Sequence, residues 1–206
     1  DVYKRQHYNV SLFKDGKNTF YDENDEYGLS EEMKYFMAGL LDHARGYTAV
    51  CNPLVNSYKR LSSGFEAPRY IAWSGSNRTP LLRIPSTRGA GTRAEVRSLD
   101  PSANPYLATA VILKAGLSGI QHQKDLTTPV DENIFEMTNK ERKAEDVEDL
   151  PTTLYTALKA LKADEVIQDA LGKHICDHFI ENKTYEWKMY SAQITAWEKE
   201  EYLTQY

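Results

Sequence analysis

The residues with the clearest chemical potential lie in one short basic segment that contains a single glutamate. This stretch, IPSTRGAGTRAEVRSLDPSANPYLA at residues 84–108, holds Arg88, Arg93 and Arg97, with Glu95 between the last two. Arginines bind carboxylates and phosphates through paired hydrogen bonds, and a carboxylate can bind a divalent metal ion. Glu95 is therefore either an ion-pair partner that reduces repulsion between arginines, or a metal ligand beside arginines that hold phosphates.

Positive charge is concentrated in a wider segment, residues 56–97. This segment has eight basic and two acidic residues, so its formal charge is +6, whereas the whole chain is −5 and the remainder is therefore −11. Seven of the eight basic residues are arginines, which suit forked recognition of carboxylate and phosphate. The segment predicts an anion-binding site, while the acidic total argues against general nucleic-acid binding.

Residues from two further segments could contribute to such a site. Glu66 follows Arg60 in the glycine-containing stretch NSYKRLSSGFEAPRY. It is either an ordinary surface carboxylate or an acid on a flap that closes over a substrate. His7 lies on a predicted strand with Asn9 and Ser11 on the same face. A lone histidine in that place is either a structural residue or a ligand.

The other histidines and the cysteines do not form a recognisable centre. His174 and His178 are four residues apart on a predicted helix, a spacing that could hold a metal, but the sequence suggests no third ligand nearby. Cys51 and Cys176 are isolated and lack metal-binding spacing. The sequence has neither a nucleophile elbow nor the glycine pattern of a phosphate-binding loop. We therefore expect these residues to be structural or to lie at the surface.

Length and composition are those of an ordinary globular domain. The chain has 206 residues, 41% hydrophobic and 27% charged, which is enough for one sizeable core. No apolar run approaches the roughly 20 residues that a membrane span requires. No secretory signal is visible and the cysteines are isolated, so we expect a cytoplasmic protein without membrane partners.

The N-terminal half alternates between strand and helix patterns. Residues 7–22 alternate polar and apolar side chains around a hairpin turn at Asp15-Gly16. An amphipathic helix is expected from a cap at Ser30 to the Asn52-Pro53 pair. Residues 81–85 and 92–98 read as strands, and in the second one the charged residues 93, 95 and 97 share a face, opposite the apolar residues 94 and 96.

The C-terminal half is mainly helical. Pro105 fits the first turn of a helix that runs to about Gly119. Residues 121–150 are polar, and we interpret the charged run 140–149 as a solvated loop. From Pro151 the pattern is helical to the end, with a break at Gly172. These patterns predict an α+β fold in which a few antiparallel strands hold the charged site and helices pack around them.

Four ordered motifs give the chain a specific family resemblance. They are NPLVNSYKRL at 52–61, GFEAP at 64–68, WSGSNRTPLLRIP at 73–85 and TRAEVRSLDPSANPYLA at 92–108, with AWEKEEYLTQY as the terminal helix. From His7 to Tyr206 the chain resembles the C-terminal part of the catalytic domain of a bacterial type I glutamine synthetase. The resemblance implies an α+β catalytic domain of that type, in incomplete form.

The resemblance implies roles in binding a metal ion and ATP. His7 and Glu95 match residues that bind the divalent ion, Mg²⁺ or Mn²⁺, which touches the γ-phosphate of ATP. This favours the metal-ligand interpretation of Glu95. The positions expected to contact ATP itself are Asn9, Ser11, Arg83 and Arg93.

The resemblance also implies residues that act on glutamate. Those expected to hold glutamate and the transferred phosphoryl group are Arg60, Arg78 and Arg97, of which the last two take part in catalysis. Glu66 matches a flap carboxylate that shields the intermediate and helps to accept a proton from ammonium. Gly64 lies beside it, in a loop that has to move.

The implied reaction is the ATP-dependent ligation of ammonia to L-glutamate, which gives L-glutamine through a γ-glutamyl phosphate intermediate. ATP, L-glutamate and ammonium are then the expected partners. Because ATP and glutamate are both anions, divalent metal ions and forked arginines are needed to reduce their repulsion. The resemblance further implies a parent enzyme that is a homododecamer of two stacked hexamers. The aromatic face of the terminal helix would suit either an oligomer contact or packing within its own subunit.

Three departures from the family pattern modify these expectations. Residues 1–6, DVYKRQ, do not match, and we expect them to be a non-native leader before a domain at 7–206. The family's N-terminal β-grasp domain and most of its metal-binding glutamates have no counterpart here, so we expect the chain alone to be inactive or nearly so. Phe135 stands where some relatives have a tyrosine that is adenylylated, and its ring has no hydroxyl to modify.

Three alternative functions remain open at this point. A ligase for another amine, such as a polyamine, would share the ATP and glutamate residues and differ around the amine pocket. A non-catalytic structural relative would have little reason to keep Glu66, Glu95, Arg60 and Arg97 together. An RNA-binding module that uses the arginine segment would need interleaved aromatic residues, which the segment lacks.

Overall fold

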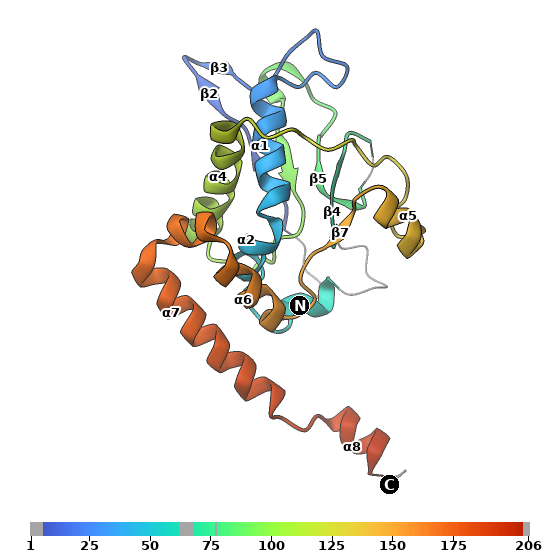
Figure 1. Ribbon diagram of the computed structural model, residues 1–206, viewed down its shortest axis with the longest axis vertical. Coiled ribbons are helices and arrows are strands. Elements are labelled where there is room, and N and C mark those ends of the chain that lie inside the picture. Colours follow the sequence, from blue (N-terminus) through green and yellow to red (C-terminus); the bar gives the residue numbers. More distant parts are fainter. Residues whose placement is uncertain (1–5, 62–67, 77, 204–206) are drawn as a thin grey trace.

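The computed structural model describes residues 6–61, 68–76 and 78–203, and within them it has a mixed sheet of five strands with helices packed against it (Figure 1). The strand order is β1 (Tyr8–Val10), β6 (Ala94–Val96), β5 (Pro80–Arg83), β4 (Tyr70–Ser74) and β7 (Glu148–Asp149). This architecture confirms the predicted α+β class. The pairs β1–β6 and β5–β6 are antiparallel, as predicted, whereas β4 and β5 are parallel.

Two helices at the front of Figure 1 supply much of the core. α1 (Glu31–Asp42) begins where the Ser30 hydroxyl accepts a bond from the amide of Met33 at 3.1 Å, and its apolar stripe is buried. The predicted helix from Ser30 to Asn52 is divided, because His43 leaves helical geometry and α2 (Ala44–Cys51) then begins. Asn52 ends α2, as the Asn52-Pro53 pair predicted.

The closest helix packing lies between α1 and α4 (Pro105–His122). A Cβ atom on Gly39 would lie 2.2 Å from the carbonyl oxygen of Ala115, and one on Gly119 would lie 2.0 Å from that of Tyr35. Both distances are shorter than any real contact, so only glycine permits the two backbones to approach this closely. The helix extends three residues beyond the predicted end at Gly119, to His122.

The predicted hairpin is present as β2 (Phe13–Lys14) and β3 (Lys17–Asn18). Its two central residues, Asp15 and Gly16, both have positive φ, at 50° and 76°, as this turn requires. A short helix, α3 (Ser57–Arg60), and a single 3₁₀ turn, η1 (Gly89–Gly91), connect the remaining elements of this half.

The prediction of a solvated loop at 140–149 was wrong. This run contains α5 (Asn139–Ala144), which a capping box between Thr138 and Glu141 begins, and then the edge strand β7. β7 pairs with β4 opposite Tyr70, and Asp149 forms an ion pair with Arg69 at 3.0 Å. Charged residues read as a loop because an exposed helix and an edge strand bury too few apolar side chains to show a period.

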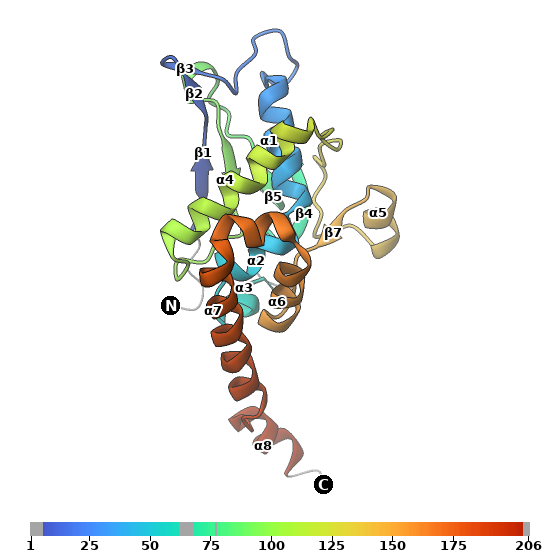
Figure 2. The ribbon, with the colours of Figure 1, turned by 60° about the vertical axis from the view of Figure 1, so that its left-hand side comes forward.

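The chain ends in three helices, as the pattern from Pro151 predicted: α6 (Leu154–Ala163), α7 (Glu165–Ser191) and α8 (Ala196–Tyr202). Gly172 breaks α7 with φ 71° and ψ 154°, which confirms the predicted interruption. Beyond Gly172 the helix projects away from the body (Figures 1 and 2), and it carries exposed residues such as Tyr185 and Met189. Within the described ranges, none of the helices is long and apolar enough to cross a membrane.

Candidate active site

The register of the sheet places four polar side chains in one row across four strands. Asn9 on β1 lies opposite Glu95 on β6, Glu95 lies opposite Arg83 on β5, and Arg83 is in register with Ser74 on β4. Paired residues on neighbouring strands point to the same face of a sheet. The apolar residues between them, Ala94 and Val96 among them, point to the other face and join the core.

Glu95 is the centre of a charged cluster on this face. Its Oε1 lies 3.2 Å from Nδ1 of His7 and 3.2 Å from Nε of Arg97, and its Oε2 lies 3.6 Å from Nη1 of Arg83. Glu95 and Arg97 are 8% and 4% exposed. Ions removed from water at such positions cost free energy unless opposite charges compensate them, so this cluster is held in one arrangement by its own pairing.

These charges line a cavity of about 510 Å³. Its walls come from β1, β5 and β6, from the connection between β4 and β5, and from the segment after α4. The lining residues are His7, Arg78, Thr79, Arg83, Glu95, Arg97, Asn133 and Phe135. A concave site with three arginines around one carboxylate can bind a phosphorylated or carboxylated ligand.

Three of the predicted ATP contacts lie together next to Glu95. Arg93 donates from Nε to Oδ1 of Asn9 at 3.1 Å, and from Nη1 to the carbonyl of Gly91 at 3.1 Å. Ser11 is half-buried and follows β1 directly. Because β1 and β6 are antiparallel, the end of β1 lies beside the start of β6, and the structure brings Asn9, Ser11 and Arg93 together there.

Arg60 is not brought into the cavity. It is 2% exposed at the end of α3, where Nη2 donates to Oδ1 of Asn52 at 3.0 Å and to the carbonyl of Ser98 at 2.5 Å. Ser98 directly follows Arg97, so Arg60 contacts the chain just beyond the end of β6. The predicted flap residues Glu66 and Gly64 lie outside the described residues.

His7 and Glu95 offer a nitrogen and an oxygen donor whose ring nitrogen and carboxylate oxygen are 3.2 Å apart. This donor set fits two ligands of one divalent ion, since Mn²⁺ accepts both donors and Mg²⁺ requires several oxygens. No group of three or more histidines, cysteines or acids in the described part of the chain is placed to hold a metal. Further ligands would have to come from water, phosphate oxygens or residues outside that part.

Thr79 and Asn133 line the cavity although no sequence pattern indicated them, and Phe135 lines it although its sequence context indicated only a position of modification. Phe135 packs its ring 5.7 Å from that of Tyr70, which fixes it at the cavity wall. Residues 121–150 carry no period or motif, so only the fold shows that this segment borders the arginines.

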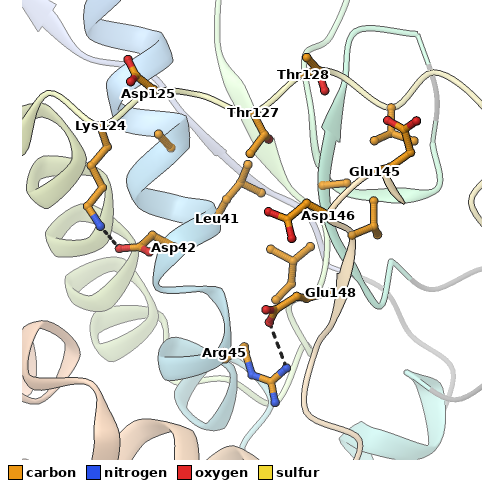
Figure 3. A pocket seen from close by; sticks show the side chains of 15 residues that line it. Leu41, Asp42, Arg45, Lys124, Asp125, Thr127, Thr128, Glu145, Asp146 and Glu148 are labelled. Carbon is orange, nitrogen blue, oxygen red and sulfur yellow. Dashed lines mark hydrogen bonds and ion pairs between the residues drawn. The ribbon is translucent and has the colours of Figure 1, made fainter. Parts of the chain in front are cut away.

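A second cavity, of about 270 Å³, lies beside α1 and the opposite part of the sheet and is shown in Figure 3. Its rim carries ion pairs of Lys124 with Asp42 and, at 3.4 Å, of Arg45 with Glu148. Apolar residues such as Leu41 form its floor. None of the predicted site residues that the structure describes lines it, so the arginine-lined cavity is the candidate active site.

The α+β domain has a sheet that holds arginines around a buried carboxylate, which are side chains suited to bind anionic ligands. Residues 4–202 match the family model of the glutamine synthetase catalytic domain. The chain therefore belongs to the glutamine synthetase family.

Curated relatives agree with this assignment. The chain is 58% identical over 200 residues to a glutamine synthetase of Staphylococcus aureus (strain MW2), and 54% identical to one of Staphylococcus epidermidis. Each alignment covers 97% of this chain and 45% of the relative, so the chain spans about half the length of these relatives.

Solved structures of a protein named GmaS share the fold. An apo form without ligand matches with a TM-score of 0.83 over 96% of this chain and 44% of that one, and a GmaS/ADP complex matches with 0.86 over 97% and 46%. Sequence identity is 40% in both cases. These structural similarities also confirm the predicted α+β catalytic-domain fold.

Proposed function

We propose that the arginine-lined cavity is part of an active site for the ATP-dependent ligation of ammonia to L-glutamate, with γ-glutamyl phosphate as the intermediate. The observation that carries this proposal is the buried Glu95, held among His7, Arg83 and Arg97 in a cavity of about 510 Å³. Membership of the glutamine synthetase family supports the reaction class.

In this proposal the arginines neutralise two anions that have to meet. Arg83 and Arg93 bind phosphates of ATP, while Arg78 and Arg97 bind glutamate and the phosphoryl group as it moves to the glutamate side chain. Their positive charges stabilise the transition state more strongly than the ground state, because negative charge shifts to the leaving oxygens. The Nε of Arg97 is already oriented by Glu95 at 3.2 Å, which lowers the cost of ordering it during the reaction. Arg60 holds the end of β6, and through it supports glutamate binding.

His7 and Glu95 are the residues that would hold a divalent ion, Mg²⁺ or Mn²⁺. When bound, such an ion supplies positive charge to the phosphate oxygens. Asn9 and Ser11 would position the nucleotide from β1. Glu66, with Gly64 beside it, would exclude water from the acyl phosphate and accept a proton from ammonium before ammonia attacks.

The chain accounts for one part of the site, and we propose that the rest comes from outside the described residues. Relatives are about twice as long, and two donors are too few for Mg²⁺ or Mn²⁺. We therefore expect the 206-residue chain alone to be inactive or nearly so. The parent enzyme is proposed to act in the cytoplasm as a homododecamer.

The test uses a completed chain, in which residues 7–202 are joined to the preceding part of the S. aureus glutamine synthetase. With ATP, glutamate, ammonium and Mg²⁺ it should form glutamine, whereas the isolated chain should not. Arg78→Ala should lower kcat by at least about 100-fold. The matched control Arg45→Ala, on the rim of the second cavity, should stay within about twofold of the parent.

Two results would refute the proposal. One is a folded completed chain that forms no glutamine, and the other is equal activity of the two arginine variants. The same assay with putrescine in place of ammonium distinguishes the amine-ligase alternative, because a polyamine ligase would prefer putrescine.

A further inference from the structure

The connection that carries Arg78 leaves the sheet at Ser74, the last residue of β4. A second segment of the chain runs beside this exit. The amide of Val130 donates to the carbonyl of Trp73 at 2.9 Å, and the indole Nε1 of Trp73 donates to the carbonyl of Thr127 at 2.7 Å. The end of β4 is therefore fastened to residues more than fifty positions away in sequence.

The same segment reaches the far end of the connection. The amide of Ile134 donates to Oγ1 of Thr79 at 3.4 Å, and Ile134 is fully buried. Residues on both sides of this contact line the arginine-lined cavity: Arg78 and Thr79 on one side, Asn133 and Phe135 on the other. Segment 127–135 thus forms a wall of the cavity and also supports the residues opposite.

Asp131 joins the two parts most directly. Its Oδ1 accepts a bond from the Ser74 hydroxyl at 2.5 Å and another from the Ser76 hydroxyl at 2.9 Å. The Ser74 hydroxyl in turn accepts from the amide of Ser76 at 3.1 Å. Hydrogen bonds to a charged carboxylate are shorter and stronger than neutral ones, so this closed set fixes the backbone of Ser76 relative to β4.

Fixing Ser74 and Ser76 constrains Arg78 from two directions. Ser74 is fully buried and in register with Arg83, which contacts Glu95. Ser76 precedes Arg78 by two residues, so a fixed Ser76 keeps the Arg78 backbone within about 7 Å. The carboxylate of Asp131 thus contacts both the strand end that pairs with Arg83 and the connection that carries Arg78.

We propose that Asp131 is a positioning residue that holds Arg78 against the arginine-lined cavity through Ser74 and Ser76. Asp131 is not among the residues that line the cavity, and its contacts with the Ser74 and Ser76 hydroxyls link it to the connection that carries Arg78. The inference rests on the proposed function, in which Arg78 binds glutamate and the transferred phosphoryl group. A group misplaced by about 1 Å can cost as much as 100-fold in rate, which is why the support of Arg78 matters.

The first test is hydrogen exchange, measured by mass spectrometry on the 206-residue chain. In Asp131→Ala, amides of residues 75–79 should exchange about tenfold faster, because the hydroxyls lose their acceptor. In Asp131→Asn the increase should stay below about threefold, because the amide oxygen still accepts. Asp125→Ala, a matched control on the rim of the second cavity, and the peptide of α1 should not change.

The proposal is overturned if Asp131→Ala leaves residues 75–79 unchanged, or if it accelerates α1 equally, since the role would then be a general one. It is also overturned if Asp131→Asn behaves like Asp131→Ala. None of these outcomes depends on a ligand, so the hydrogen-exchange result stands even if the proposed function fails.

The second test uses the completed chain and separates kcat from KM. Asp131→Ala should lower kcat about tenfold, with the KM for ATP within about twofold and with most of kcat restored in Asp131→Asn. Unchanged kcat despite faster exchange at 75–79 would overturn the positioning role. If the parent completed chain forms no glutamine, the proposed function fails, and hydrogen exchange alone decides whether Asp131 holds the connection.

Discussion

The two cavities beside the sheet carry charge of opposite sign and hold it in different ways. In the arginine-lined cavity, Glu95 and Arg97 are almost fully buried and contact each other along one strand. The second cavity (Figure 3) is lined by more acidic than basic residues, and we call it the carboxylate-lined cavity. There the paired side chains of Arg45 and Glu148 are 49% and 64% exposed. Water and salt screen the second kind of pair, whereas the first is screened little.

This difference shows why residue type alone does not define a site. Both cavities contain acids and bases at ion-pair distance. Burial makes an ion costly unless its partners stay in place, so a buried cluster keeps one geometry. An exposed cluster can rearrange at little cost, and it mainly keeps the surface soluble. The functional proposal therefore depends on the burial of Glu95 as much as on its neighbours.

The largest predicted difference between the two cavities is in how much a lost carboxylate lowers the free energy of unfolding. Glu95→Ala should lower the free energy of unfolding by about 3–5 kcal/mol, because it leaves Arg97 buried without this carboxylate. Urea denaturation followed by circular dichroism measures the change. A loss below about 1 kcal/mol would mean that the pair is as replaceable as a surface pair.

The packing of α1 against α4 in the core gives the next largest effect. Gly119→Ala should destabilise the chain by about 1–3 kcal/mol, because the new methyl group meets backbone atoms of α1 that cannot move aside. The control Leu117→Ala alters an exposed residue on the same helix. Equal melting temperatures for the two variants would show that the helices can separate at little cost.

Helix α2 begins beside the second cavity and ends in the core, which allows a pH test. Arg45 near its start lines the carboxylate cavity, while Cys51 at its end is fully buried and its carbonyl accepts from Asp100. Burial raises the pKa of the Cys51 thiol from its ordinary value of 9.0 to about 12. The folded state therefore keeps a proton that the unfolded state loses above pH 9, so stability is complete below pH 9 and falls up to about pH 12.

Between pH 9 and pH 10 this thiol should contribute a loss of about 1 kcal/mol. Thermal melts of the parent and of Cys51→Ala across this range measure it, since the variant should lose less stability with pH. Burial also raises the pKa values of Tyr47 and Tyr58, so the variant should keep part of the slope. Identical slopes in the two proteins would contradict the burial argument.

The smallest effect is expected in the carboxylate-lined cavity. Glu148→Ala should change the free energy of unfolding by less than about 1 kcal/mol, and 1 M NaCl should remove most of that difference. Denaturation at low and high salt measures both. A large, salt-resistant loss would place this cavity in the same class as the arginine-lined one.

Sequence patterns predicted most of the elements that position the candidate site. The alternation around Glu95 predicted which residues of β6 enter the core. The cap at Ser30 and the first-turn proline Pro105 predicted two of the core helices. These signals are local, since each depends on side chains within one or two turns of the chain.

What the sequence did not reveal depends on contacts between distant segments. Strand β4 was missed, and its pairing with β7 joins segments more than seventy residues apart, which no local pattern encodes. The same holds for Asn133 and Phe135, which reach the cavity only because segment 127–135 packs beside β4. His43, where the first helix divides, contacts Asp164, which is 121 residues away in sequence.

A small backbone rotation at Gly172 would produce a large displacement at the C-terminal end of the chain. About 19 residues of α7 follow it, which at 1.5 Å per residue make a rigid rod of about 28 Å. A backbone rotation of about 10° at this one glycine would therefore carry the far end of the rod, and α8 with it, through about 5 Å. The direction in which the chain presents its terminal aromatic residues is thus set at a single hinge, far from the surface that those residues form.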